Sequence, residues 1–208
     1  MGEIARQGRG ASAGQGTDPR TLDEIEHEAI EIDALVGELL ASARIEFQAV
    51  TPKPLDAVEL ARRALERAGE DAGKLVSAPP PIPFAADPTL VGRALANLID
   101  NARKHGGGLV RLAVRADAGG VSFEVIDRGR GFAPGDESRV FERFYRGADP
   151  DAGAHGSLGL GLALVKRIAD AHGGRVHAAN QPGGGARVVL ELPVAPPPRP
   201  PAASAPDP

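Results

Sequence analysis

The stretch from His155 to Gly174, HGSLGLGLALVKRIADAHGG, most constrains what this chain can fold into. Three glycines lie within six positions near its start, and the apolar-periodic run that follows them predicts a helix ending at the final glycine pair. Glycines at a helix start let backbone N–H groups approach an anion, and the helix dipole favours negative charge there. The stretch therefore predicts a phosphate-binding helix start, with a flexible loop before a core helix as the alternative.

A regular apolar seam predicts one long helix over residues 21–47. Spacings of three and four alternate along it, at Leu22, Ile25, Ala29, Ile32, Val36, Leu39 and Ala43. A single helix cannot bury such a stripe, so we expect a homodimer through this helix; packing against the globular part of the chain is the alternative. Residues 1–20, rich in small and polar side chains, predict a flexible lead-in.

Two further helices are indicated by aspartates that precede them. Asp56 caps a helix through about Ala68, and the pair Asp87-Pro88 begins another that ends near His105. Between them, residues 74–86 hold a proline run and apolar residues suitable for one short strand.

Strand signals complete the globular part. Residues 48–55 carry two prolines and predict an edge strand or a linker. Two hairpins are predicted, over 109–126 and 175–192, each around a glycine-containing turn. Hairpins make the sheet at least partly antiparallel, so we predict an α+β two-layer sandwich over residues 52–193, followed by a proline-rich disordered tail at 194–208.

Composition narrows the classes of function. The 208 residues are 42% hydrophobic and 25% charged, which is globular, and the net charge of −4 offers no basic footprint for nucleic acid. Cysteine is absent, which excludes disulfides and thiolate metal sites. No apolar run approaches a membrane span, so we expect a cytoplasmic location without membrane contact, leaving open whether a parent protein is anchored.

One face of the predicted helix 87–105 carries polar side chains. Four of them fall at i, i+4, i+7 and i+8, namely Asn97, Asn101, Lys104 and His105. Asn101 offers a neutral oxygen to Mg²⁺, and Lys104 suits a phosphate as a point charge. The alternative is a solvated polar face.

Asp127 ends an apolar strand in the segment VIDRGRGFAP and is followed by Gly129 and Gly131. A carboxylate beside residues without side-chain bulk can accept a hydrogen bond from a planar ligand edge, such as an adenine amino group. A simple Asp/Gly turn is the alternative interpretation.

Four motifs, NLIDNARKHG, DRGRG, FERFYR and GLGLALVKRIADAHGG, occur in this order. Together they resemble the N, G1, F and G2 boxes of the sensor histidine kinase catalytic domain, a Bergerat-type (GHKL) ATP-binding fold, over about residues 52–193. The helix at 21–47 is similar to the second helix of that family's dimerisation hairpin. The resemblance implies an ATP- and Mg²⁺-dependent protein histidine kinase of a two-component system.

The resemblance also implies roles for single residues. Asn101 resembles the Mg²⁺ ligand, and Asn97 stands at the position linked to phosphoryl transfer. Lys104 and His105 would lie near the phosphates. Asp127 would bind the adenine amino group.

Further roles are implied for the segments that follow. Gly129 and Gly131 would shape the adenine pocket, and Arg143 and Arg146 would be lid arginines near the phosphates. The phosphate-side backbone would come from the glycine box, at Gly156, Gly159, Leu160 and Gly161. The family commonly has Gly-Thr or Gly-Ser directly before Gly-Leu-Gly-Leu, whereas this chain has Gly156-Ser157-Leu158 there.

The family's phosphoacceptor motif, His-Glu-apolar-basic-x-Pro, is missing. His27-Glu28 is its partial match, and neither the basic residue nor the proline follows. We therefore predict that the chain does not phosphorylate itself stably on histidine. Its expected partners are ATP, a phosphoacceptor histidine hairpin in trans and a response regulator receiver domain.

Two other functions stay open at this point. One is an ATP-binding regulatory or scaffold module without phosphotransfer. The other is a different member of the superfamily, such as an anti-sigma-type serine kinase. The FERFYR motif and the heptad helix favour the histidine kinases over this second group.

Overall fold

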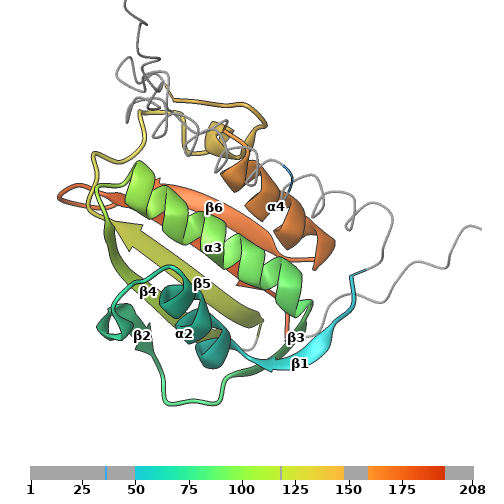
Figure 1. The fold of residues 1–208 in the computed structure, drawn as a ribbon. Coiled ribbons are helices and arrows are strands. Elements are labelled where there is room, and N and C mark those ends of the chain that lie inside the picture. The colour runs from blue at the N-terminus through green and yellow to red at the C-terminus, as the bar shows by residue number, and fades with distance from the viewer. Residues whose placement is uncertain (1–35, 37–49, 118, 148–158, 195–208) are drawn as a thin grey trace, which may run out of the picture.

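The computed structural model describes residues 36, 50–117, 119–147 and 159–194. Within them, three α-helices pack on one face of a five-stranded sheet (Figure 1). The two-layer α+β sandwich expected from the hairpins is confirmed. The lead-in at 1–20, the long helix at 21–47 and the tail at 194–208 lie outside the described residues, apart from Val36 and Val194.

The main sheet has the strand order β2-β4-β5-β7-β6. Its strands are β2 (Leu75–Ser77), β4 (Leu109–Asp117), β5 (Gly120–Asp127), β7 (Ala186–Leu192) and β6 (Arg175–Asn180). The pair β2 and β4 is parallel, while the other three pairs are antiparallel. Both predicted hairpins are present, as β4–β5 and β6–β7.

A second, two-stranded sheet joins β1 (Lys53–Asp56) to β3 (Pro83–Ala86) in antiparallel pairing. The single short strand expected in residues 74–86 is therefore wrong, because the structure has β2 and β3 there, in different sheets. The prolines at 79–81 explain the break, since proline has no N–H to donate to a ladder.

The helices begin where the sequence predicts. In α2 (Ala57–Arg67), Asp56 Oδ1 accepts from Val58 N at 3.0 Å; in α3 (Pro88–Lys104), Asp87 Oδ1 accepts from Thr89 N at 3.0 Å. The third helix, α4 (Gly161–Ala171), starts inside the glycine box. Short 3-10 turns occupy η1 (Ala72–Lys74) and η2 (Arg139–Phe141). No helix among the described residues is long and apolar enough to cross a membrane.

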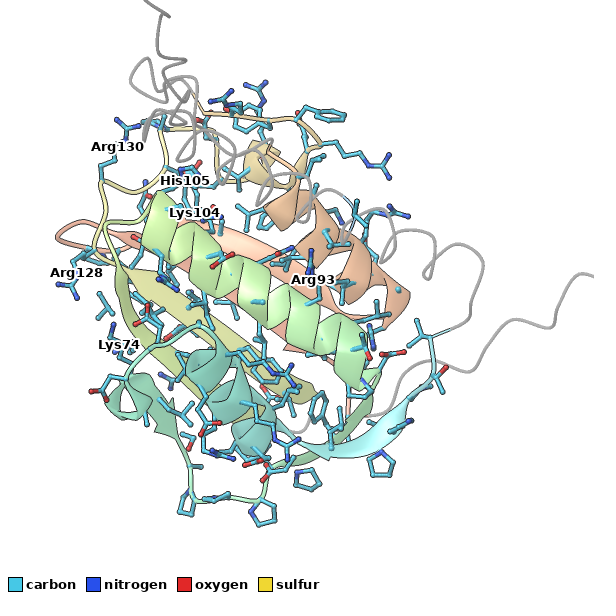
Figure 2. The ribbon with its side chains drawn as sticks, in the orientation of Figure 1. Lys74, Arg93, Lys104, His105, Arg128 and Arg130 are labelled. Carbon is cyan, nitrogen blue, oxygen red and sulfur yellow. The ribbon has the colours of Figure 1, made fainter. Side chains whose placement is uncertain are left out.

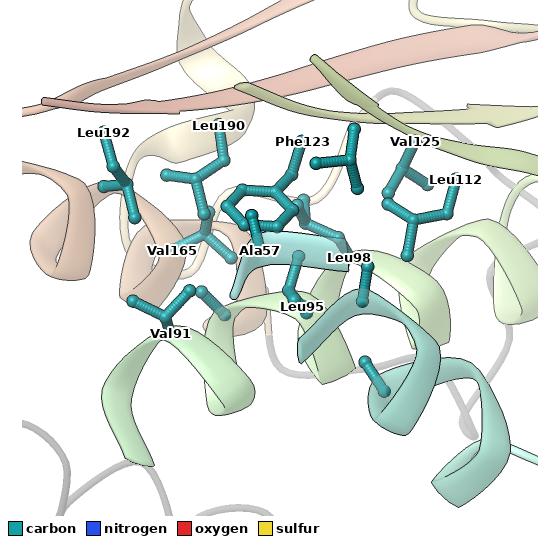
Figure 3. Packing of buried hydrophobic residues seen from close by; sticks show 14 of the residues in the cluster. Ala57, Val91, Leu95, Leu98, Leu112, Phe123, Val125, Val165, Leu190 and Leu192 are labelled. Carbon is teal, nitrogen blue, oxygen red and sulfur yellow. The ribbon is translucent and has the colours of Figure 1, made fainter. Parts of the chain in front are cut away.

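The core lies between the helices and the sheet and is almost wholly aliphatic. Figure 3 shows Leu95 and Leu98 of α3 and Val165 of α4 facing Phe123 and Leu190 of the sheet. These side chains are completely or almost completely buried. Burying them holds α3 and α4 side by side, which matters because Asn97, Asn101 and Lys104 lie on α3 and Gly161 begins α4.

A buried polar link fixes the far ends of the same helices. His172, only 1% exposed, follows α4; its Nδ1 donates to Ile168 O at 2.8 Å, and its Nε2 accepts from Asp87 N at 3.0 Å. Asp87 is itself the cap of α3, and its Oδ2 accepts from Thr51 N at 3.4 Å. One histidine therefore fastens the end of α4 to the start of α3.

Candidate functional site

Asp127, the last residue of β5, is 7% exposed, and its two carboxylate oxygens have different surroundings. Oδ1 accepts hydrogen bonds from Gly129 N at 3.0 Å and from Ala186 N at 2.7 Å. Oδ2 accepts no hydrogen bond from the part of the chain that the structure describes. The fold thus fixes the orientation of the carboxylate through Oδ1 alone.

Gly106, directly after α3, faces this carboxylate. A Cβ on Gly106 would lie 2.4 Å from Asp127 Oδ2, and one on Gly129 would lie 2.9 Å from Gly106 Cα. The backbones also pair, because Arg128 N donates to Gly106 O at 3.0 Å. Glycine at both positions therefore brings the end of α3 against the end of β5. The sequence predicted only that the helix ends near His105 and gave Gly106 no role in the site, since a contact between distant segments leaves no local pattern.

The β6–β7 hairpin contacts Asp127 and the residues that follow it. Gly131 has a φ of +80°, and Asn180 at the end of β6 bonds the next residue, Phe132, through both its side-chain groups. Gly185 has a φ of +92°, and a Cβ there would lie 2.2 Å from Asp127 O. Asn180 and Gly185 were missed from the sequence, where Gly185 is one of three turn glycines and Asn180 simply precedes the turn.

The four polar side chains expected on one face of α3 and at its C-cap differ in exposure. Asn97 and Asn101 are half-buried, whereas Lys104 and His105 are exposed. Lys104 Nζ lies 3.9 Å from Asp100 Oδ2. Figure 2 shows Lys104 and His105 at the C-terminal end of α3, and Arg130 is drawn near the same end. Lys104 and Arg130 thus bring positive charge to this end of α3, although the whole chain carries a net charge of −4.

The start of α4 meets this face. Asn97 Nδ2 donates to Gly161 O at 3.2 Å, and a Cβ on Gly161 would lie 3.8 Å from Asn97 Cγ. Leu160 occupies the N-cap position, and its side chain makes no capping hydrogen bond. The Leu160 side chain thus leaves the first backbone N–H groups of α4 uncapped. Backbone N–H groups at a helix start can bind an anion when no side chain caps them.

The segment before the glycine box is held to it by backbone. Gly159 has a φ of +68°; its carbonyl accepts from Phe144 N at 3.1 Å, and a Cβ there would lie 2.5 Å from Tyr145 O. Phe144 also has a positive φ, of 62°, and is 69% exposed. For a bulky side chain this backbone conformation is strained, and such strain concentrates at functional sites.

Within this segment, Arg139 Cζ lies 4.5 Å from the centre of the Tyr145 ring. A hydrogen bond with Asp136 and burial raise the pKa of Tyr145. The predicted lid arginines, Arg143 and Arg146, are both exposed. Gly156 lies outside the described residues.

Two of the predicted site segments contact α3. Its middle meets the glycine box through Asn97, and its C-terminal end meets Asp127 through Gly106. Within the described ranges, no group of three or more His, Cys, Asp or Glu side chains is placed to hold a metal ion.

The family model for the histidine kinase-, DNA gyrase B- and HSP90-like ATPases matches residues 86–196. The sensor-like histidine kinase SenX3 of Mycobacterium tuberculosis is 33% identical over 183 residues, covering 84% of this chain and 45% of that protein. The chain spans less than half the length of the curated relatives it matches.

Two solved structures extend the comparison. Full-length ShkA in complex with AMPPNP is 30% identical, with a TM-score of 0.64, covering 85% of this chain and 38% of that one. The ATP binding domain of PrrB from Mycobacterium tuberculosis is 34% identical, with a TM-score of 0.54, covering 69% of this chain and 97% of that one. The chain therefore belongs to the histidine kinase-, DNA gyrase B- and HSP90-like ATPase family, as an ATP-binding catalytic domain of the sensor histidine kinase kind.

Proposed function

We propose that this chain binds Mg-ATP along the polar face of α3 and transfers the γ-phosphoryl group to a histidine on a separate helical hairpin. The observation that carries the proposal is the Asp127 carboxylate, fixed through Oδ1 by two backbone N–H groups while Oδ2 has no donor among the described residues. The family membership and the kinase relatives support the same function.

At the base end, Asp127 Oδ2 accepts a hydrogen bond from the adenine amino group. Gly106 and Gly129 fit this role, because side chains there would fill the space beside the carboxylate. Gly131 allows the backbone turn that carries the segment away. An amino group satisfies the buried oxygen, whereas the keto group at the same place in guanine leaves it facing another acceptor.

At the phosphate end, Asn101 is half-buried, and none of the described residues forms a hydrogen bond with its side chain. Its amide oxygen fits a Mg²⁺ ion, which prefers oxygen ligands and supplies charge neutralisation between phosphates when bound. Lys104 adds positive charge at the end of the same face, and His105 lies beside it. The backbone N–H groups from Gly159 to Gly161 bind phosphate oxygens, and Arg143 and Arg146 approach them from the preceding segment.

Phosphoryl transfer depends mainly on positioning and on neutralising charge. Asn97 is positioned for this by its hydrogen bond to Gly161 at the start of α4. The acceptor histidine comes from a separate hairpin, since His27 lacks the flanking basic residue and proline. The phosphoryl group then passes to a response regulator receiver domain.

Mixing the chain, radiolabelled ATP, Mg²⁺ and a separate helical hairpin with an acceptor histidine tests the proposal. We expect acid-labile, base-stable label on the hairpin, and no label when Asn101→Ala replaces the wild-type chain. If the chain binds ATP but the hairpin stays unlabelled, the proposed phosphoryl transfer is wrong and only the proposed nucleotide binding stands. Label on the chain itself that disappears in His27→Gln would show self-phosphorylation and contradict the trans arrangement.

The proposed homodimer has its own test. Replacing Ile32 and Leu39 with Glu places charges on the apolar seam of residues 21–47 and should give monomers that still bind ATP. Sedimentation of the wild-type chain as a monomer at high concentration would contradict the dimer.

A further inference from the structure

Asn180, the last residue of β6, holds the backbone of the segment that follows Asp127. Its Oδ1 accepts a hydrogen bond from Phe132 N at 2.6 Å, and its Nδ2 donates one to Phe132 O at 2.9 Å. One side chain thus pairs with both backbone groups of a residue 48 positions earlier in the sequence. Such two-point pairing fixes the orientation as well as the position of Phe132.

The approach of Asn180 is close enough to restrict the residue before Phe132. Gly131 has a φ of +80°, and a Cβ there would lie 2.3 Å from Asn180 Oδ1. Gly131 and Asn180 therefore depend on one another, because the amide reaches Phe132 only where position 131 has no side chain.

The hairpin that carries Asn180 also contacts the other end of the segment. Ala186 N, at the start of β7, donates to Asp127 Oδ1 at 2.7 Å. The turn between them is closed by Gln181 N, which donates to Gly185 O at 2.9 Å. The β6–β7 hairpin therefore holds residues 127–132 at both ends.

We propose that Asn180 is a positioning residue for the adenine end of the site. Through Phe132 it fixes the backbone conformation of residues 127–132. This conformation places Gly129 N, which donates a hydrogen bond to Asp127 Oδ1 at 3.0 Å. Loss of the Asn180 amide leaves the position of Gly129 N less well fixed. Because this N–H helps to orient the Asp127 carboxylate, the position of Oδ2 becomes less well defined as well. This inference rests on the proposed binding of an adenine nucleotide at Asp127.

The test compares three probes by calorimetry on the full chain: ATP, purine riboside triphosphate, which lacks the 6-amino group, and inorganic tripolyphosphate. The wild-type chain should prefer ATP to purine riboside triphosphate. Asn180→Ala should weaken ATP binding by about three- to tenfold and reduce the ratio of ATP affinity to purine riboside triphosphate affinity. Its affinity for tripolyphosphate should equal that of the wild type. The matched control is Gln181→Ala, whose hydrogen bonds use only the backbone and which should behave as wild type.

Each result has one meaning. Failure of the wild-type chain to bind ATP would overturn the proposed function itself. Wild-type ATP binding with an unchanged ATP preference in Asn180→Ala, or an equal loss for all three probes, would overturn the positioning role.

A second pair of variants covers the case in which Asn180→Ala unfolds. Asn180→Asp keeps the acceptor for Phe132 N and removes only the donor, so it should also narrow the ATP preference. Gly131→Ala should weaken ATP binding less in the Asn180→Asp background than additivity predicts, because both changes disturb the same pairing of residue 180 with Phe132. Strict additivity, with folding verified by circular dichroism, would contradict the proposed contact.

Discussion

The side-chain amide of Asn97 donates a hydrogen bond to the carbonyl oxygen of Gly161 at 3.2 Å, which joins the middle of α3 to the first residue of α4. The contact spans 64 positions in the sequence. It sets where the glycine box begins relative to the polar face of α3, and therefore sets the spacing between the two halves of the proposed phosphate site.

Asn97→Ala should weaken phosphate binding while leaving the base end intact. The variant removes one partly buried hydrogen bond, so we expect a loss of about 0.5–1.5 kcal/mol in tripolyphosphate binding, measured by calorimetry. Adenosine affinity should stay the same. A variant that loses adenosine and tripolyphosphate equally would show that Asn97 supports the whole domain instead.

Asp127→Asn should abolish the preference for adenine without unfolding the chain. The amide oxygen can still accept from Gly129 N and Ala186 N, but an NH₂ group then replaces Oδ2 and faces the adenine amino group donor to donor. We expect ATP affinity to fall by about 1–3 kcal/mol in calorimetry. Asp117→Asn is the control, because that carboxylate also accepts from two backbone N–H groups, in the β4–β5 turn. Equal ATP affinity in wild type and Asp127→Asn would refute the adenine assignment.

Helix starts and hairpins were predictable because their signals are local. Asp56 and Asp87 each cap the helix that follows, and both hairpins form at their glycine turns. Contacts between distant segments were not predictable in the same way. Tertiary packing determines three such contacts: the pairing of β2 with β4, the close approach of Gly106 to Asp127, and the hydrogen bonds between Asn180 and Phe132. Membership of the family was recognised because four motifs occur in order, which no single motif could establish.

Gly106→Ala should lower both stability and nucleotide affinity. A Cβ at this position would lie 2.4 Å from Asp127 Cγ and Oδ2, so the carboxylate or the end of α3 must move. We expect destabilisation of about 1–3 kcal/mol in urea unfolding, together with weaker ATP binding. Gly92→Ala on α3 is the control; it meets nothing within 4 Å and should stabilise the chain by up to about 1 kcal/mol.

Glu124 makes stability depend on acid pH. Burial alone would raise its pKa, but hydrogen bonds from Arg187 and Arg111 outweigh this effect and leave the pKa below its ordinary value of 4.5. Because the folded pKa is lowered, the stabilisation is complete above the unfolded pKa and is lost as the pH falls through the folded pKa. Below about pH 4.5, the free energy of unfolding of Glu124→Gln should therefore decrease less steeply with falling pH than that of the wild type.

Urea titrations at several pH values measure this slope. Glu59→Gln is the control, because the pKa of Glu59 is also lowered, first by its hydrogen bond with Arg62, but Glu59 lies at the surface, where solvent screens the pair. An acid slope in Glu124→Gln that equals the wild-type slope would exclude Glu124 as a source of the pH dependence.

His172→Ala should be one of the most destabilising single changes in the chain. The side chain is almost fully buried and bonds both Ile168 O and Asp87 N, so alanine leaves a cavity and an unpaired N–H. We expect a loss of about 2–4 kcal/mol in urea unfolding. His177→Ala, on an exposed position of β6, should stay within about 0.5 kcal/mol of wild type. Similar losses for the two histidines would contradict the structural role of His172.

The bond from Ala186 N to Asp127 Oδ1 has a consequence for how the chain acquires its activity. Asp127 belongs to the middle of the sequence, yet its carboxylate is fixed by the first residue of the last strand, 59 positions later. During synthesis from the N-terminus, the proposed base end of the site therefore stays incomplete until β7 has left the ribosome and paired with β5. Nucleotide then binds only the finished domain, and each binding event draws the folding equilibrium toward that state.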